Sequence, residues 1–190
     1  MSRTTLALLI CTICPLPAVV DAGPDGPEHV IVYLSLEEAL DKAFPKADSV
    51  WSDSWKPSAF ERTQIERRLG WQLADSIFTI YRGRSAGRDL GYATVGNEVG
   101  LYKPITFMVK VGIDMKVESV HVMVFRESRG GEVRRRRFLA QYDGKSLRSP
   151  IRINRDIVGV TGATLSVRAM NAGVKKSLAV VQTAFPQAGE

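Results

Sequence analysis

The chain has 190 residues, of which 45% are hydrophobic and 24% are charged, and its formal net charge is +6. This length suits one globular domain with its own core, and the many apolar residues exclude a disordered chain. The positive charge favours anionic partners in general, but the chain lacks the basic stripe interleaved with aromatic residues that single-strand binders use, so we expect no nucleic acid as a partner.

The first 22 residues have the features of a secretory signal peptide. Arg3 supplies a positive start, Leu6 to Cys14 form an apolar run, and Ala22 is a small residue suited to cleavage. The run is shorter than the about 20 residues that a transmembrane helix needs, and a retained membrane anchor is the alternative. We therefore expect residues 1–22 to be removed and the protein to be periplasmic or otherwise extracytoplasmic.

Both cysteines of the chain, Cys11 and Cys14, lie in this predicted signal peptide. Cleavage would leave a mature chain without cysteine, which excludes disulfides, iron–sulfur clusters and thiol redox chemistry. The two histidines, His29 and His121, lie far apart in the chain, so we expect no metal site. Any redox chemistry of the mature protein would therefore depend on an added group.

The rest of the chain is predicted to consist of a linker with the start of the mature chain (23–34), an N-terminal helical region (35–72) and a larger domain (73–185). Two capping boxes, Ser35–Glu38 and Ser58–Glu61, predict two helices in the helical region. In each box a serine precedes a glutamate by three residues, a pattern that satisfies free N–H groups at the start of a helix.

Four segments of the larger domain are rich in β-branched and aromatic residues and predict strands: Ser76–Arg82, Leu90–Val95, Ile105–Val111 and Val117–Phe125. The last two are joined by a short loop, which indicates a hairpin. Helices, then a meander of strands, then a final helix predict a single α+β domain with an antiparallel sheet.

Four consecutive arginines, Arg134 to Arg137, form the strongest local charge in the chain. In a helix these side chains would spread outward while Val133, Phe138 and Tyr142 pack inward. A solvated basic surface is one interpretation, and a docking patch for an acidic redox partner is the other.

A turn with two hydroxyl side chains opens the last predicted helix. Residues 156–164 (DIVGVTGAT) lead into an amphipathic segment, Leu165–Val181, with apolar residues at spacings of three and four. Free N–H groups and the positive end of the helix dipole meet at such a start, which suits a phosphate. The alternative is that Thr161 or Thr164 is only a helix N-cap.

Thr161-Gly162-Ala163-Thr164 resembles the Ser/Thr-Gly-Ala-Thr signature of the covalent FMN-binding domain family. This family includes flavinylated subunits of sodium-pumping quinone reductases and Rnf-type complexes, and small exported flavoproteins. The segments Gly91-Tyr92, Phe125–Ser128 and Gly144–Ser146 follow the family's order, so the resemblance covers roughly half of the chain.

The resemblance implies that flavin mononucleotide (FMN) is bound to Thr164 through a phosphoester. It also implies that a separate flavin transferase takes the flavin from FAD, and that the isoalloxazine ring supplies the redox chemistry. The other cofactor-binding residues that it implies are Thr161, Gly162, Ala163, Leu165, Glu127 and Ser128.

The chain departs from the family three residues before the signature, where an aspartate usually stands. Val158 has this position, and the nearest acid is Asp156. Either the turn is built differently here, or the transferase recognises it less well. For Glu127 and Ser128, the alternative to a place near the ring is an ordinary polar end of a strand.

We expect from these features an exported flavoprotein that works as an electron carrier, since nothing in the sequence marks a substrate pocket. Whether it is also an enzyme stays open, because a flavin-dependent reductase of a small molecule is an alternative. A binding or sensor domain that has lost the flavin is another. The expected partners are the flavin transferase and redox partners that are membrane-bound or soluble.

Overall fold

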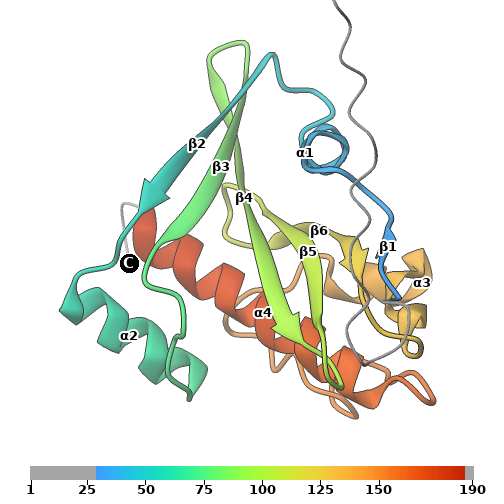
Figure 1. The fold of residues 1–190 in the computed structure, drawn as a ribbon. Coiled ribbons are helices and arrows are strands. Elements are labelled where there is room, and N and C mark those ends of the chain that lie inside the picture. The colour runs from blue at the N-terminus through green and yellow to red at the C-terminus, as the bar shows by residue number, and fades with distance from the viewer. Residues whose placement is uncertain (1–28, 187–190) are drawn as a thin grey trace, which may run out of the picture.

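Six strands form one antiparallel sheet in the computed structural model, which describes residues 29–186. From β2 to β6, each strand pairs with the next one along the chain, whereas β1 pairs with β6 at the opposite edge (Figure 1). In spatial order the strands are β1 (Ile31–Val32), β6 (Val117–Phe125), β5 (Pro104–Val111), β4 (Arg88–Val99), β3 (Phe78–Ser85) and β2 (Ser49–Trp55).

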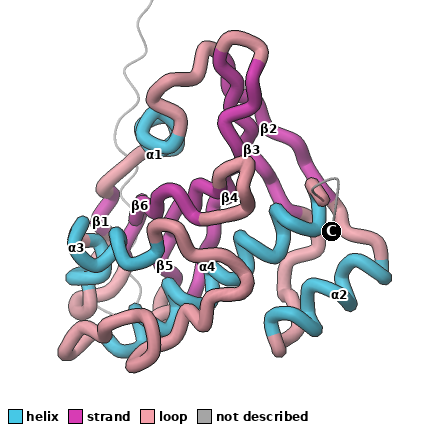
Figure 2. Tube along the Cα trace, turned by 180° about the vertical axis from the view of Figure 1, so that it is seen from behind, coloured by secondary structure: helices cyan, strands magenta, loops and turns pink. Residues whose placement is uncertain are grey.

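Helices lie on both faces of this sheet, as Figures 1 and 2 show from opposite sides. The long helix α4 (Thr164–Ala184) crosses one face against β4 and β5, and α2 (Ala59–Leu69) packs beside it. Helix α1 (Leu36–Ala43) lies on the other face against β5 and β6. Three short helices follow β6 and lie beside it: η1 (Gly131–Arg134), α3 (Arg136–Leu139) and η2 (Ala140–Tyr142).

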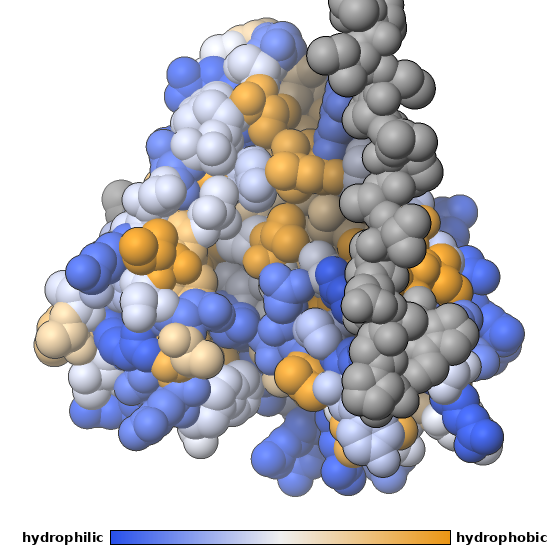
Figure 3. All heavy atoms as spheres, in the orientation of Figure 1, coloured by the Kyte–Doolittle hydropathy of each residue, from blue (hydrophilic) through white to orange (hydrophobic). Residues whose placement is uncertain are grey.

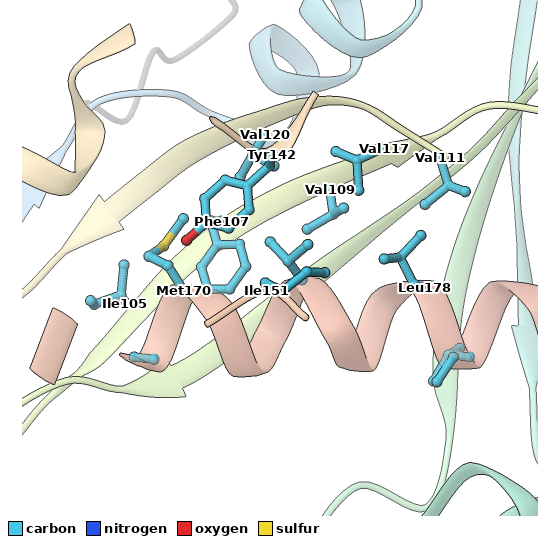
Figure 4. Close-up of a cluster of buried hydrophobic side chains, with 14 of the residues drawn as sticks. Ile105, Phe107, Val109, Val111, Val117, Val120, Tyr142, Ile151, Met170 and Leu178 are labelled. Carbon is cyan, nitrogen blue, oxygen red and sulfur yellow. The ribbon is translucent and has the colours of Figure 1, made fainter. Parts of the chain in front are cut away.

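The main core fills the space between α4 and the sheet. Figure 4 shows Phe107 on β5 next to Met170 of α4 and to Tyr142. All three side chains are fully buried, so this layer fixes the position of α4 and of the turn that precedes it. The apolar stripe of α4 has the predicted spacing and is buried throughout: Val167, Met170, Val174, Leu178 and Val181.

Gly173 allows α4 to approach the sheet closely. A Cβ atom at this position would overlap the buried ring of Phe107 and the side chain of Glu98. We expect Gly173→Ala to lower the free energy of unfolding by about 1–2 kcal/mol, although an alanine in an unobstructed helix would raise it by up to about 1 kcal/mol. Gly96→Ala is the matched control for urea denaturation, because its Cβ would lie 3.7 Å from the same ring. Equal stability of the two variants would contradict this packing.

The predicted α+β class, with N-terminal helices, an antiparallel sheet and a C-terminal helix, is confirmed. Both capping boxes are formed: Ser35 Oγ accepts the Glu38 N–H at 3.1 Å, and Ser58 Oγ accepts the Glu61 N–H at 3.3 Å. Region 35–72 is not only helical, however, because it also contains β2, which pairs along its whole length with β3.

The arginine run lies on the surface after β6. Arg134 to Arg137 are all exposed, whereas Val133 and Phe138 are buried, as the helical interpretation predicted. The guanidinium of Arg134 lies 4.7 Å from the centre of the Tyr33 ring. The exposure of the four arginines fits both interpretations, a solvated basic surface and a docking patch for an acidic redox partner.

The surface in Figure 3 is largely hydrophilic at its rim, with apolar side chains gathered over the middle of the sheet, between α1 and the strands β2 and β3. No helix among residues 29–186 combines the length and the apolar character that crossing a membrane requires. The predicted signal peptide and both cysteines lie outside the described residues, so cleavage and export stay predictions.

Candidate functional site

The turn before α4 leaves two threonine hydroxyls unused by the helix. The Ala163 N–H donates to the Val160 carbonyl at 3.0 Å, and Gly162 has a φ of 78°. This is a β-turn with a positive φ at its third residue, a position that favours glycine. Ala163 is the N-cap and has no side chain that could cap the helix. The interpretation of Thr161 or Thr164 as the N-cap is therefore wrong.

Thr164 is the first residue of α4, and its side chain is exposed. The backbone N–H groups of Thr164, Leu165 and Ser166 have no acceptor within the described part of the chain. Unpaired N–H groups at the start of a long helix favour an anion there, and the helix dipole acts in the same direction. The start of α4 therefore combines a free hydroxyl with donors suited to a phosphate.

Thr161 and Thr164 line an open cleft of about 1080 Å³. One wall is the loop that precedes α4 (151–160), the floor is α4 itself, and the end of α2 forms the other side. The remaining lining residues are Leu69, Gly70, Trp71, Ile151, Arg152, Ile153, Asn154, Val158, Gly159, Val160, Arg168, Asn171, Ala172 and Lys175.

The charged residues of this cleft are all cationic. Arg168 and Lys175 stand four and eleven residues after Thr164, on the face of α4 that lines the cleft, and Arg152 reaches it from the loop. None of the three forms an ion pair within residues 29–186. Burial and the charge of Arg152 lower the pKa of Lys175 from its ordinary value, and Asp156 opposes this shift only in part. An anion in the cleft would relieve this repulsion.

Asp156, the acid nearest to the signature, organises the loop. Its carboxylate accepts the N–H groups of Ile151 at 3.1 Å and of Arg152 at 2.9 Å, and pairs with Lys145 Nζ at 2.9 Å. Ile151 is buried with a φ of 44°, a conformation that is strained for a β-branched residue. The carboxylate of Asp156 thus holds a strained wall of the cleft in place.

Removing this charge should weaken the loop in a pH-dependent way. Burial raises the pKa of Asp156, but the hydrogen bonds from Arg152, Lys145 and Ile151 outweigh it, and the pKa lies below its ordinary value of 3.8. Such a carboxylate stabilises the fold above that ordinary value, and this stabilisation is lost as the pH falls through the lower folded value. We expect the free energy of unfolding of the wild type to fall more steeply below about pH 5 than that of Asp156→Asn. Parallel pH profiles in urea denaturation would contradict this role.

Val158 has the position where the family usually has an aspartate, and its side chain is 74% exposed at the cleft. Its backbone is held by Gln141: the Val158 N–H donates to Oε1 at 2.7 Å, and Nε2 donates to the Val158 carbonyl at 3.4 Å. The turn is therefore anchored through main-chain atoms, without an acid at this position.

The structure does not place Glu127 and Ser128 in the cleft. The Glu127 carboxylate accepts the backbone N–H groups of Leu101, Tyr102 and Lys103 at 2.6, 2.9 and 3.1 Å, and so fixes the β4–β5 turn. Both residues line a separate pocket beside η1. The same loop meets the first turn of α4 at Gly130, where an added Cβ would overlap the Ser166 hydroxyl.

The other predicted cofactor residues lie at the turn. Gly162 and Ala163 shape it, and Leu165 is 40% exposed but does not line the cleft. Trp71, Arg152, Arg168 and Lys175 were not predicted. Helical spacing from Thr164 would have indicated the two cations of α4, whereas nothing in the sequence links Trp71 to this turn. Among residues 29–186, no group of three or more His, Asp or Glu could hold a metal ion.

Together, the fold and the site define an α+β domain with a phosphate-suited cleft at the start of its last helix. Residues 100–179 match the sequence model of the FMN-binding domain, the same family that the signature resembles. The fold is similar to that of NqrC from Shewanella oneidensis, with a TM-score of 0.53 and 15% identity, over 74% of this chain and 84% of that one. No curated protein matches the sequence. The match to the FMN-binding domain supports FMN as the cofactor.

Proposed function

We propose that this protein carries FMN covalently on Thr164 and transfers electrons outside the cytoplasm. One observation carries the proposal: the Thr164 hydroxyl has the acceptor position of the family signature and opens directly onto the cationic cleft. The part that concerns export depends on the predicted signal peptide, and the expected redox partners are membrane-bound or soluble.

The residues of the cleft fit FMN. The N–H groups at the start of α4 and the guanidinium of Arg168 suit its phosphate. Gly162 adds no side chain beside the attachment point, and the cleft exceeds the volume that a small ligand needs. When bound, the isoalloxazine ring would supply the reversible electron transfer.

Attachment requires a flavin transferase and FAD. The Thr164 oxygen forms a bond to the phosphorus of the FMN half of FAD, the pyrophosphate bond breaks, and AMP leaves. The hydroxyl proton is released in the same exchange, so the protein gains the mass of FMN less one water. The chain contributes the acceptor and the cationic surroundings of the phosphate, and the transferase contributes the chemistry.

The cleft favours an electron carrier over a reductase. No Asp, Glu or His is found among the described residues that line it. Reduction of a small molecule usually requires a proton donor near the ring, and carboxylates and imidazoles are its common sources. A second substrate therefore has no evident proton source here.

The test is the mass of the intact protein after production together with a flavin transferase. We expect the added mass of FMN less one water, and yellow colour that persists after denaturation. An unmodified wild type under these conditions would contradict the proposal and favour a domain that has lost the flavin. Turnover with a reduced donor and small-molecule acceptors would favour the reductase.

A further inference from the structure

The outer edge of β6 is open between two paired ends. At one end the Met123 carbonyl accepts the Tyr33 N–H at 2.8 Å, next to the pairing with β1. At the other end the Val117 N–H donates to the Lys145 carbonyl at 2.8 Å. Between them, the outer edge of residues 118–122 forms no main-chain hydrogen bond to another segment of the described chain, 29–186. A strand with such a free edge accepts a further strand by main-chain pairing.

The open edge borders a cavity of about 590 Å³, which we call the edge notch. It is formed by residues 120–122 of β6, by Tyr33 and Leu34 after β1, by Lys42 of α1 and by side chains of the segment 134–143. The notch lies between α1 and α3, which both contact β6 (Figure 1). At about 3.3 Å per residue, the open stretch is about 17 Å long. The notch therefore has room for a short extended segment.

Positive charge surrounds the edge notch. Its charged residues are three exposed cations and one acid: Lys42, Arg134, Arg136 and Asp143. None of the three cations forms an ion pair within residues 29–186. Burial and the nearby charge of Lys42 lower the pKa of His121, which also lines the notch. An acidic occupant would find partners here, whereas a second copy of the chain on this edge would bring two sets of cations together.

We propose that the open edge of β6 binds an extended acidic segment of a partner protein, which adds to the sheet as a further strand. The pairing of β1 with the end of β6 shows that this edge accepts a strand. Main-chain hydrogen bonds supply affinity, and the cations of the notch select acidic side chains. Tyr33 and Leu139 offer apolar contacts to the side chains between them. The inference goes beyond the proposed function, because it depends neither on Thr164 nor on a bound flavin.

The probe is a rhodamine-labelled peptide that alternates glutamate and valine, and fluorescence anisotropy measures its binding to the purified protein. We expect saturable binding that weakens as salt is added, because exposed charges contribute to it. The same peptide with methylated backbone amides should bind at least about tenfold more weakly, because it lacks the N–H donors of a strand. A peptide that alternates lysine and valine should not bind.

Two variants test the role of the charges. Arg136→Glu should weaken binding of the glutamate–valine peptide about fivefold, the size expected for one exposed ion pair. Arg137→Glu is the matched control, because Arg137 is exposed next to Arg136, does not line the notch and gives the same change in net charge. Equal weakening in both variants would show attraction to overall charge alone and would overturn the inference.

Hydrogen exchange tests the location. Bound peptide should slow amide exchange within residues 118–122, because the outer N–H groups of this stretch become paired. Saturable binding without this protection would place the peptide elsewhere and overturn the inference, as would the absence of saturable binding. Exchange that is fully protected before peptide is added would mean that another segment covers the edge, and would also overturn it. None of these results bears on flavin at Thr164.

Discussion

Replacing Thr164 by alanine should abolish the covalent flavin completely and leave the fold intact. The hydroxyl oxygen is the only side-chain atom of this residue that can form the phosphoester, and alanine lacks it. Because Ala163 and not Thr164 is the N-cap, no capping bond is lost. An exposed first-turn position tolerates alanine, so we expect the free energy of unfolding to change by no more than about 0.5 kcal/mol. In-gel flavin fluorescence of denatured protein and urea denaturation measure the two quantities.

Two neighbouring variants make this result specific. Thr164→Ser keeps the hydroxyl and should retain at least part of the loading. Thr161→Ala removes the other threonine that lines the cleft but leaves the attachment atom in place, so flavin should remain bound. Full loading of Thr164→Ala would exclude Thr164 as the attachment site, and loss of flavin in Thr161→Ala alone would favour attachment on Thr161.

Reversing the charge of Arg168 should slow flavin attachment about tenfold or more. Arg168 stands one turn after Thr164 and lines the same cleft, where it forms no ion pair within residues 29–186. A hydrogen bond to a charged group contributes about 1.5–3 kcal/mol, and each 1.4 kcal/mol corresponds to a factor of ten. In Arg168→Glu this attraction to the phosphate becomes repulsion. The initial rate of flavinylation, followed with purified transferase and FAD, measures the effect.

Arg155→Glu is the control for this variant. Arg155 belongs to the same loop region and is exposed, but its side chain does not line the cleft. It produces the same change in net charge, so it accounts for any general loss of attraction between the basic protein and FAD or the transferase. Equal rates in the two variants would show that Arg168 acts only through overall charge.

Local sequence signals predicted most of the fold. The capping boxes located both N-terminal helices, because the side chains of serine and glutamate at that spacing each accept the backbone N–H of the other residue. Strand β6 has the predicted bounds, and the three-and-four spacing of α4 marks its buried stripe. The TGAT turn was also located from a local signal, because Gly162 permits a backbone conformation that few other residues adopt.

Other features depend on contacts between distant segments and have no local signal. Strand β2 alternates exposed polar residues with partly buried tryptophans and forms only because β3 pairs with it. Glu127 follows the strand as predicted, but its carboxylate binds the β4–β5 turn and not the cleft. Trp71 reaches the site because α2 packs beside α4, which a single sequence does not reveal.

The most direct measurement of the central claim is peptide mass mapping of wild-type protein produced with a flavin transferase. Trypsin cleavage after Arg155 and Arg168 yields the peptide 156–168, which contains Thr161, Thr164 and Ser166. We expect this peptide to carry the mass of FMN less one water, with fragmentation placing the addition on Thr164. An unmodified peptide from protein that was produced with an active flavin transferase would contradict the assignment of Thr164 as the flavin attachment site. Addition of FMN on another residue would also contradict it.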